Sequence, residues 1–284
     1  MADPGVPPAG EPTTRLDGRT AVVVGGHSGF GLAISRTFAA RGATVVVAAR
    51  RAELVDRVAT EIGGIGATCD ITDDDAVAAL VSRVVDETGR LDAFVNCAGF
   101  QRSTPIADLT GDLLDEMHAV QLGGAMSCIR HAANAMRELG HGGSFVSISS
   151  LTAHNPARGL AAYASAKAGL EYATKIAAVE YGDAGIRFNA ISASLIETPM
   201  TAGHFENPTA IAALREMTPL GRMGSPQDIA NAALFLCCEL GDYVTGQTLC
   251  VDGGASLLAL PTPQMYADVA RRRQEAAGDD GSGA

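Results

Sequence analysis

The sequence lacks a long hydrophobic run, a secretory signal and a basic charge balance. No apolar stretch approaches the ~20 residues that a membrane-spanning helix needs. The opening MADPGVPPAGEPTTRLDG does not follow the basic-then-apolar order of a signal peptide. The formal net charge of −11 argues against nucleic acid as a partner, because binding to phosphates needs a basic face. These absences predict a protein without membrane or nucleic-acid partners.

Patterns for metal binding and disulfide formation are also missing. The six histidines show no metal-ligand spacing, and no CxxC occurs among the six cysteines. Most of the cysteines lie within apolar runs; they stand at positions 69, 97, 128, 237, 238 and 250. We therefore expect buried free thiols in a cytoplasmic protein, with no disulfide framework and no metal site.

What is present is an alternation of short apolar runs with longer helical stretches, in a chain that is 47% hydrophobic. The runs are rich in β-branched residues and mostly lack apolar/polar alternation, which is typical of strands buried on both faces of a parallel sheet. Strands are expected at 21–26, 44–49, 92–97, 144–149, 186–192 and 248–254, with a weaker one at 68–72. Helices are expected at about 29–41, 51–62, 73–88, 109–139, 163–181 and 226–239.

This alternation predicts an α/β fold: a single doubly wound Rossmann-type domain with a mainly parallel sheet flanked by helices. We expect the domain to span residues 18–260, between a disordered leader at 1–17 and a partly disordered tail at 261–284. Residues 194–218 are irregular and long for a connection, which predicts a substrate-binding loop or lid.

A glycine-rich turn follows the first expected strand, in VVVGGHSGFGLAISRTF at 22–38. Gly25, Gly29 and Gly31 leave room for the backbone to approach a pyrophosphate, whose charge the following helix N-terminus stabilises. The spacing is G-x3-G-x-G and differs from the common GxGxxG fingerprint. Its place between strand and helix predicts a dinucleotide site.

The end of the second expected strand bears on the choice between NAD and NADP. An acid here would bind the ribose 2′-hydroxyl of NAD, whereas an arginine would accommodate the 2′-phosphate of NADP. The sequence has Ala49 followed by Arg50 and Arg51, so a guanidinium is present and a carboxylate is not. NADP is favoured and NAD stays possible, because both arginines could simply solvate the start of a helix.

A phenol and an amine lie four residues apart in GLAAYASAKAGL at 159–170. In a helix, Tyr163 and Lys167 would lie one turn apart on the same face. The alternative is that the tyrosine packs and the lysine reaches solvent. A free phenol titrates near pH ~10, and an adjacent ammonium can lower that pKa toward a range useful for acid–base catalysis.

Several motifs in fixed order make residues 18–256 resemble the short-chain dehydrogenase/reductase family, in its single-domain branch. They are V-G-G-H-S-G-F-G (24–31), C-D-I-T (69–72), N-C-A-G (96–99), I-S-S (148–150), Y-A-S-A-K (163–167), I-R-F-N-A (186–190) and V-T-G-Q…V-D-G-G (244–254). The resemblance implies that Tyr163 is the general acid/base, and that Lys167 grips the nicotinamide ribose and lowers the pKa of Tyr163. It also implies that Ser150, otherwise readable as a cap or turn residue, polarises the substrate carbonyl.

The resemblance also implies a cofactor-binding set and a substrate pocket. Asp70 would contact the adenine, Asn96 and Gly99 would support the sheet beside the cofactor, and Thr198 would contact the nicotinamide carboxamide. The full cofactor set is Gly25, Ser28, Gly29, Phe30, Gly31, Arg50, Arg51, Asp70, Ile71, Asn96, Ala98, Gly99, Tyr163, Lys167, Ile196 and Thr198. The substrate would meet Gln101, Leu151, His154 and Leu195.

The chain departs from the family pattern at two places. Ala193-Ser194 replaces the usual Pro-Gly after the sixth expected strand, which changes how that loop meets the nicotinamide. Gln121 replaces an asparagine that, in many members, helps to hold a water linking the lysine to bulk solvent. Gln121 is therefore counted with the catalytic residues, as a relay residue with shifted geometry.

The longer side chain of Gln121 predicts a working but slowed proton relay. A Gln121→Asn variant should therefore turn over faster than the wild type. An equal or lower kcat, measured under saturating cofactor, counts against this relay.

The sequence thus predicts an oxidoreductase that transfers a hydride between NADP(H) and a carbonyl/secondary alcohol pair. The alternatives are an NAD-dependent alcohol dehydrogenase of the same fold, and a cofactor-binding scaffold or sensor with little turnover. By resemblance we also expect a homo-oligomer, a dimer or a homotetramer, assembled through the helix that carries Tyr163 and Lys167 and through C-terminal segments.

Overall fold

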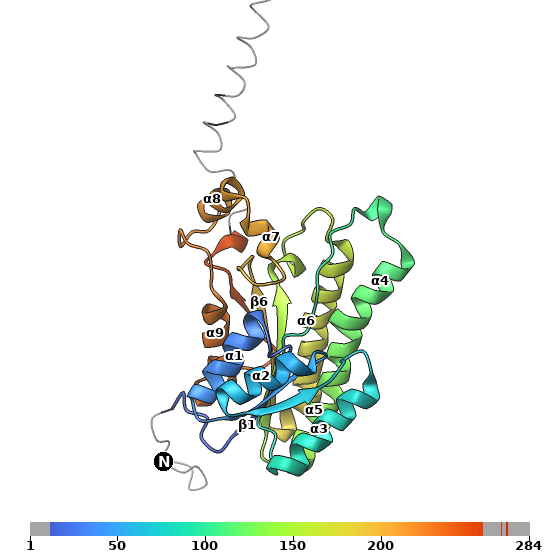
Figure 1. The fold of residues 1–284 in the computed structure, drawn as a ribbon, viewed down its shortest axis with the longest axis vertical. Helices are drawn as coiled ribbons and strands as arrows, with labels where there is room; N and C mark the ends of the chain where they lie inside the picture. Colours follow the sequence, from blue (N-terminus) through green and yellow to red (C-terminus); the bar gives the residue numbers. More distant parts are fainter. Residues whose placement is uncertain (1–11, 258–267, 269–270, 272–284) are drawn as a thin grey trace, which may run out of the picture.

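The computed structural model describes residues 12–257 together with Asp268 and Arg271. Seven parallel strands form one sheet in the order β3-β2-β1-β4-β5-β6-β7 (Figure 1). This order confirms the predicted α/β fold with a doubly wound sheet. The strands are β1 (Thr20–Val24), β2 (Thr44–Ala49), β3 (Ile65–Thr68), β4 (Ala93–Asn96), β5 (Gly143–Ser150), β6 (Ile186–Ala193) and β7 (Thr248–Val251).

Helices cover both faces of the sheet. The longer ones are α1 (Gly29–Ala40), α2 (Ala52–Ile62), α3 (Asp74–Thr88), α4 (Gly111–His118), α5 (Ala125–Leu139), α6 (Ala161–Tyr181), α8 (Pro208–Glu216) and α9 (Pro226–Cys237). One core cluster joins the sheet to α1, α2 and α9, and the other joins it to α3, α5 and α6. No described helix is long and apolar enough to cross a bilayer.

The central strands are buried because their side chains are apolar on both faces. Val22 and Val24 pack into the core of α3, α5 and α6, whereas Val23 packs into the core of α1, α2 and α9. Phe94 and Phe145, on neighbouring strands, stack with ring centroids 5.1 Å apart, and Phe188 on β6 continues the stack at 5.6 Å. These contacts fix the middle of the sheet, from which the loops at the strand ends extend.

The structure corrects the predicted third strand and the long helix at 109–139. The strand is Ile65–Thr68, not 68–72, because an Asp70 carboxylate oxygen accepts hydrogen bonds from the backbone and hydroxyl of Thr72 and turns the chain. The long helix is interrupted by a π-helical turn, η2 (Ala119–Gly124), between α4 and α5. A Cβ on Gly124 would lie 2.7 Å from the Ile71 carbonyl oxygen, so this turn packs closely on the segment after β3.

Two other expectations differ from the structure at exposed or terminal positions. Residues 12–17, assigned to the leader, contact the domain: Leu16 is 1% exposed, and its backbone N–H donates to the Arg41 carbonyl. Cys250 is exposed on β7, whereas four of the six cysteines are buried and Cys97 is half-buried, all as free thiols. The rest of the leader and the tail at 261–284 lie outside the described residues, apart from Asp268 and Arg271.

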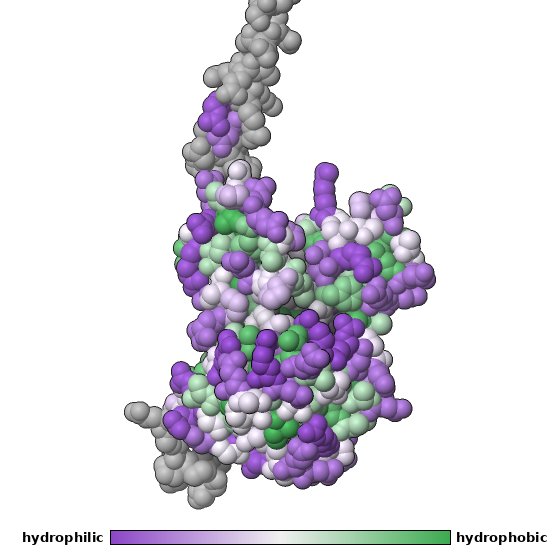
Figure 2. Space-filling model, viewed as in Figure 1, coloured by the Kyte–Doolittle hydropathy of each residue, from purple (hydrophilic) through white to green (hydrophobic). Residues whose placement is uncertain are grey.

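The predicted loop at 194–218 contains two helices, α7 (Ala202–Phe205) and α8. They lie beyond the carboxyl end of β6, at the top of Figure 1. Doubly wound sheets bind ligands beyond the carboxyl ends of their strands, so this segment lies where a substrate is expected. Figure 2 shows the surface hollowed between this part and the part that carries η1 (Ile106–Asp108) and α4.

Candidate functional site

The glycine loop between β1 and α1 is set by close backbone packing. A Cβ on Gly31 would lie 2.3 Å from the Gly25 carbonyl oxygen, and one on Gly25 would lie 3.0 Å from the backbone of Cys97 and Ala98. Gly25 and Gly29 also have positive φ angles of 74° and 51°, which L side chains rarely adopt. The loop therefore rests on the segment after β4, with no side chain between them.

The first turn of α1 is open to an anion. Ser28 is the N-cap, but its side chain makes no capping hydrogen bond, so the first N–H groups have no side-chain partner. A Cβ on Gly29 would lie 3.5 Å from Thr198, which brings the segment after β6 against this loop. Phe30 packs against the core beside this turn, and Ile196 is buried in that core. The predicted cofactor residues from both ends of the chain thus lie together.

The two arginines after β2 have different partners. Arg50 forms an ion pair with Asp70 at 3.8 Å, and both side chains are largely exposed. Arg51 donates instead to Nε2 of His27 in the glycine loop, at 2.7 Å. Since arginine has no acceptor, this bond requires a lone pair on Nε2 and leaves the proton on Nδ1. Burial, with Arg51 and Arg57 nearby, lowers the pKa of His27 and favours that neutral form.

The turn after β4 is held by its own asparagine. Asn96 is 3% exposed, and its side-chain oxygen accepts from the Ala98 backbone N–H at 3.1 Å. A Cβ on Gly99 would lie 2.7 Å from the Gln121 Oε1 atom, so the Gln121 amide packs directly on this turn. The turn is therefore clamped between the glycine loop and the π-helical turn η2.

Ser150 and Tyr163 meet at the carboxyl end of β5. Ser150 is the last residue of β5, and Tyr163 lies in the first turn of α6. The Ser150 hydroxyl lies close enough to Tyr163 to oppose the rise that burial causes in the pKa of the phenol. The Ser150 hydroxyl oxygen also accepts from the backbone N–H and the hydroxyl of Thr152, at 3.2 and 3.0 Å. These bonds fix the position of the serine oxygen.

Lys167 lies one turn after Tyr163 and is 5% exposed. Its Nζ donates to the Ile148 carbonyl oxygen at 2.7 Å and lies 5.7 Å from the centroid of the Tyr163 ring. Burial lowers the pKa of Lys167 to about 8. The amine thus lies beside the phenol, as the spacing predicts.

The pKa of Tyr163 differs from its predicted direction. Burial raises this pKa, and the group that opposes the rise is Ser150. Lys167 is not among the causes of this shift, so the expectation that it lowers the pKa of Tyr163 stays a prediction. The site therefore holds Tyr163 as a neutral phenol, ready to donate a proton.

Gln121 lies in η2 and is 1% exposed. Its Nε2 donates to the Phe100 carbonyl oxygen, and its Oε1 is buried without a hydrogen-bond partner among the described residues. Within the described part of the chain, the Gln121 amide contacts Gly99 and Phe100. Its predicted place in a proton relay stays a prediction.

The predicted substrate residues come from three loops. Gln101 follows the turn after β4, Leu151 and His154 follow Ser150, and Leu195 follows β6; Gln101, Leu151 and Leu195 are half-buried. His154 forms an ion-pair contact with Glu171 at 2.9 Å, and its side chain is 43% exposed. The sequence alone gave no reason to single out Glu171, which lies four residues after Lys167 on the same helix.

The described residues hold no group of three or more His, Cys, Asp or Glu side chains arranged for a metal ion. The groups that meet at the carboxyl end of β5 are a serine hydroxyl, a phenol and an amine. A fixed hydroxyl beside a half-buried phenol and a buried amine can stabilise a developing alkoxide and move a proton to or from it.

Comparison with known proteins agrees with this geometry. A family model described as enoyl-(acyl carrier protein) reductase matches residues 24–256. The 3β-hydroxysteroid dehydrogenase 1 of Eggerthella lenta is 36% identical over 85% of this chain and 95% of its own length. The D-threitol dehydrogenase of Mycolicibacterium smegmatis is 33% identical over 86% of this chain and 95% of its own. A solved short-chain type dehydrogenase/reductase from Mycobacterium ulcerans has a TM-score of 0.82 at 34% identity, covering 86% of this chain and 91% of that one.

Proposed function

Because the chain belongs to the short-chain dehydrogenase/reductase family, we propose that it transfers a hydride between NADP(H) and a carbonyl/secondary alcohol pair. The observation that carries this proposal is the convergence of Ser150, Tyr163 and Lys167 at the carboxyl end of β5, beside the glycine loop. The two named relatives act on a steroid alcohol and on a sugar alcohol, which agrees with a secondary alcohol as the reacting group.

The side chains of the site supply proton transfer and charge stabilisation. A bound nicotinamide cofactor supplies or takes up the hydride. In the direction of reduction, Ser150 donates a hydrogen bond to the substrate carbonyl oxygen, and Tyr163 gives its proton to that oxygen as negative charge develops. The positive charge of Lys167 stabilises the phenolate that remains. These interactions strengthen as charge develops, which is the requirement for lowering the barrier.

The residues around the glycine loop fit a dinucleotide. The backbone of Gly25 and Gly31 leaves no room for a Cβ, and the first turn of α1 offers N–H groups without a side-chain partner. Thr198 lies against Gly29, so a cofactor bound along this loop would also meet the segment after β6.

We infer that Arg51, rather than Arg50, binds the 2′-phosphate of NADP. Arg50 already has a carboxylate partner in Asp70. Among the ion pairs of residues 12–257, none involves Arg51 or Arg57. Arg51 donates to His27 in the glycine loop, and the charges of both arginines lower the pKa of that histidine. Two guanidinium groups beside a neutral histidine favour the binding of a dianionic phosphate. Because Arg51 has no carboxylate partner, the phosphate would not have to displace one.

Arg51→Ala should weaken NADPH binding about 10- to 100-fold, which is the value of one or two charge-assisted hydrogen bonds. NADH binding should change less than about twofold, because NADH lacks the phosphate. Dissociation constants for both cofactors, measured by nucleotide fluorescence on purified protein, test this. Arg50→Ala is the matched control and should have the smaller effect on NADPH. Equal affinities for the two cofactors, unchanged by Arg51→Ala, contradict the preference for NADP.

The predicted homo-oligomer has support in the exposed face of α6. Tyr172, Ile176 and Val179 follow one another on this helix and are 67%, 47% and 84% exposed. Such an apolar face is suited to burial against a second copy of the chain. A dimer or homotetramer assembled through α6 therefore remains part of the proposal, as does the cytoplasmic location.

A further inference from the structure

The buried amine of Lys167 requires a counter-charge. An ammonium that is 5% exposed loses most of its hydration, and its charged form is then costly unless an anion lies nearby. The hydrogen bond from Nζ to the Ile148 carbonyl is to a neutral group. Anionic groups around the amine therefore decide how much of it stays protonated near neutral pH.

Glu171 provides a buried carboxylate in the right place. It lies four residues after Lys167 on α6, and its side chain is 7% exposed. One of its oxygens accepts from the Ser149 hydroxyl at 2.6 Å, and the other lies 2.9 Å from His154 Nε2. Lys167 and Glu171 thus bond to consecutive residues of β5, Ile148 and Ser149, so both side chains lie against the same stretch of strand.

Four other titratable side chains lie around Lys167 and Glu171, and one of them, His154, contacts Glu171 directly. They come from four elements: Cys97 after β4, Tyr163 on α6, His154 after η3 (Leu151–Ala153) and Cys250 on β7. Burial raises the pKa of Cys97 to about 12 and also raises the pKa values of Tyr163 and Cys250, so none of the three is anionic near neutral pH. Cys97 and then Glu171 oppose the effect of burial on the pKa of Lys167, and Glu171 is the carboxylate of the two.

We propose that Glu171 is a positioning residue whose buried carboxylate, held by Ser149 and His154, keeps Lys167 charged. This inference rests on the proposed function, because Lys167 acts on the reaction through Tyr163 and the cofactor. It also extends that function, because the Ser149–Glu171–His154 cluster then helps to set the pH range over which the enzyme is active. The His154 side chain in this cluster is 43% exposed.

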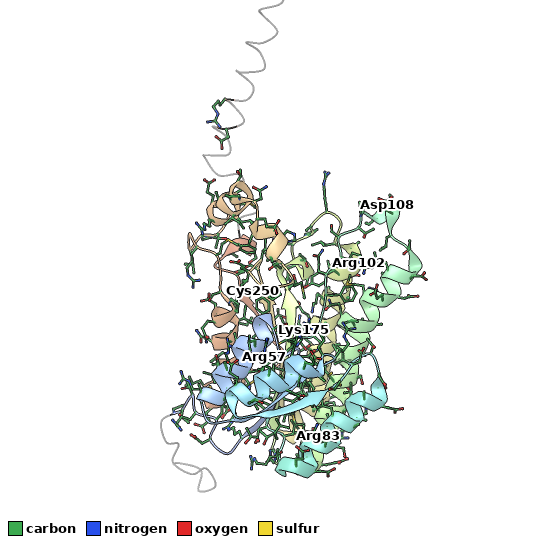
Figure 3. The ribbon with its side chains drawn as sticks, in the orientation of Figure 1. Arg57, Arg83, Arg102, Asp108, Lys175 and Cys250 are labelled. Carbon is green, nitrogen blue, oxygen red and sulfur yellow. The ribbon has the colours of Figure 1, made fainter. Side chains whose placement is uncertain are left out.

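The test uses the lysine content of the chain. Lys167 and Lys175 are the two lysines in the sequence, and Lys175 is exposed on the same helix (Figure 3). In protein labelled with ¹³C at lysine Cε, NMR therefore follows one buried amine and one exposed internal reference. Wild-type Lys167 should titrate near pH 8.

In Glu171→Gln, the Lys167 midpoint should fall by about one pH unit, a tenfold loss in its protonation equilibrium, since a nearby carboxylate is worth about this much. Lys175 should titrate as in the wild type. Glu180→Gln, the same change at an exposed position on α6, is the matched control and should leave both lysines unchanged. Glu171→Asp, which keeps the charge, should restore most of the wild-type midpoint.

Glu171→Met, which fills a similar volume without a charge, replaces Glu171→Gln if that variant does not fold. A wild-type Lys167 midpoint in either uncharged variant overturns the proposal. Failure of both to fold, while Glu171→Asp folds, makes Glu171 a structural residue and also overturns it. The NMR midpoint needs no turnover, so this result is independent of the proposed reaction. Where activity is measured, the limb of kcat/KM that reports Lys167 should move to lower pH in Glu171→Gln.

Discussion

Tyr163→Phe should lower kcat about 100- to 10,000-fold, the range expected when a general acid is removed. The substitution deletes the hydroxyl that lies beside Ser150 and leaves the half-buried ring in place. Because Lys167 and the glycine loop are unchanged, NADPH affinity should stay within about twofold of the wild type. Initial rates with saturating cofactor and substrate, together with a cofactor titration, measure both quantities.

The matched control for this substitution is Tyr172→Phe. Tyr172 lies on the same helix but is 67% exposed, away from Ser150. It should keep near-normal turnover. A Tyr163→Phe enzyme that works at the rate of this control would show that another group supplies the proton.

Gly31→Ala should weaken NADPH binding at least about tenfold and lower Tm by several degrees. An added Cβ would lie 2.3 Å from the Gly25 carbonyl oxygen and 2.7 Å from its carbonyl carbon. Both are backbone atoms that cannot rotate away, so the turn and the start of α1 have to separate. Overpacking of this kind costs roughly 1–3 kcal/mol, and it displaces the N–H groups that we propose bind the pyrophosphate.

Gly111→Ala is the control, since a Cβ at the start of α4 would meet nothing within 4 Å. Its Tm should not fall, and should rise by at most about two to four degrees, because alanine favours a helix over glycine by about 1 kcal/mol. Calorimetry and cofactor titration compare the two variants. If Gly31→Ala binds NADPH as well as Gly111→Ala does, the glycine loop is not where the pyrophosphate binds.

Much of the fold follows from local patterns in the sequence. Val22, Val23 and Val24 are apolar without alternation, and this pattern correctly predicts a strand buried on both faces. Gly25 and Gly31 are identified by their place between strand and helix, and the structure gives each a backbone contact that excludes a side chain. Such features can be predicted because neighbours in sequence determine them.

Features that depend on distant residues were harder to predict. The third strand lies earlier in the sequence than predicted, because the turn at Asp70 follows it. The π-helical turn that contains Gln121 packs on Gly99 and Ile71, which are both far away in sequence. The pKa of Tyr163 is set by burial, which a four-residue spacing does not reveal. Likewise, only the tertiary structure pairs Arg50 with Asp70 and Glu171 with His154.

The central claim is hydride transfer to a carbonyl carbon, with the proton supplied by Tyr163. Its most direct test is to mix the protein with NADPH deuterated at the transferring position of C4 and a panel of cyclic, steroid and sugar ketones. Mass spectrometry of the products then locates the label. We expect one deuterium on the carbinol carbon of at least one product, and loss of that product with Tyr163→Phe. The contrary result is a protein that binds NADPH to saturation but neither oxidises it with any ketone nor reduces NADP with the matching alcohols. That result would contradict the account and identify the protein as a cofactor-binding scaffold.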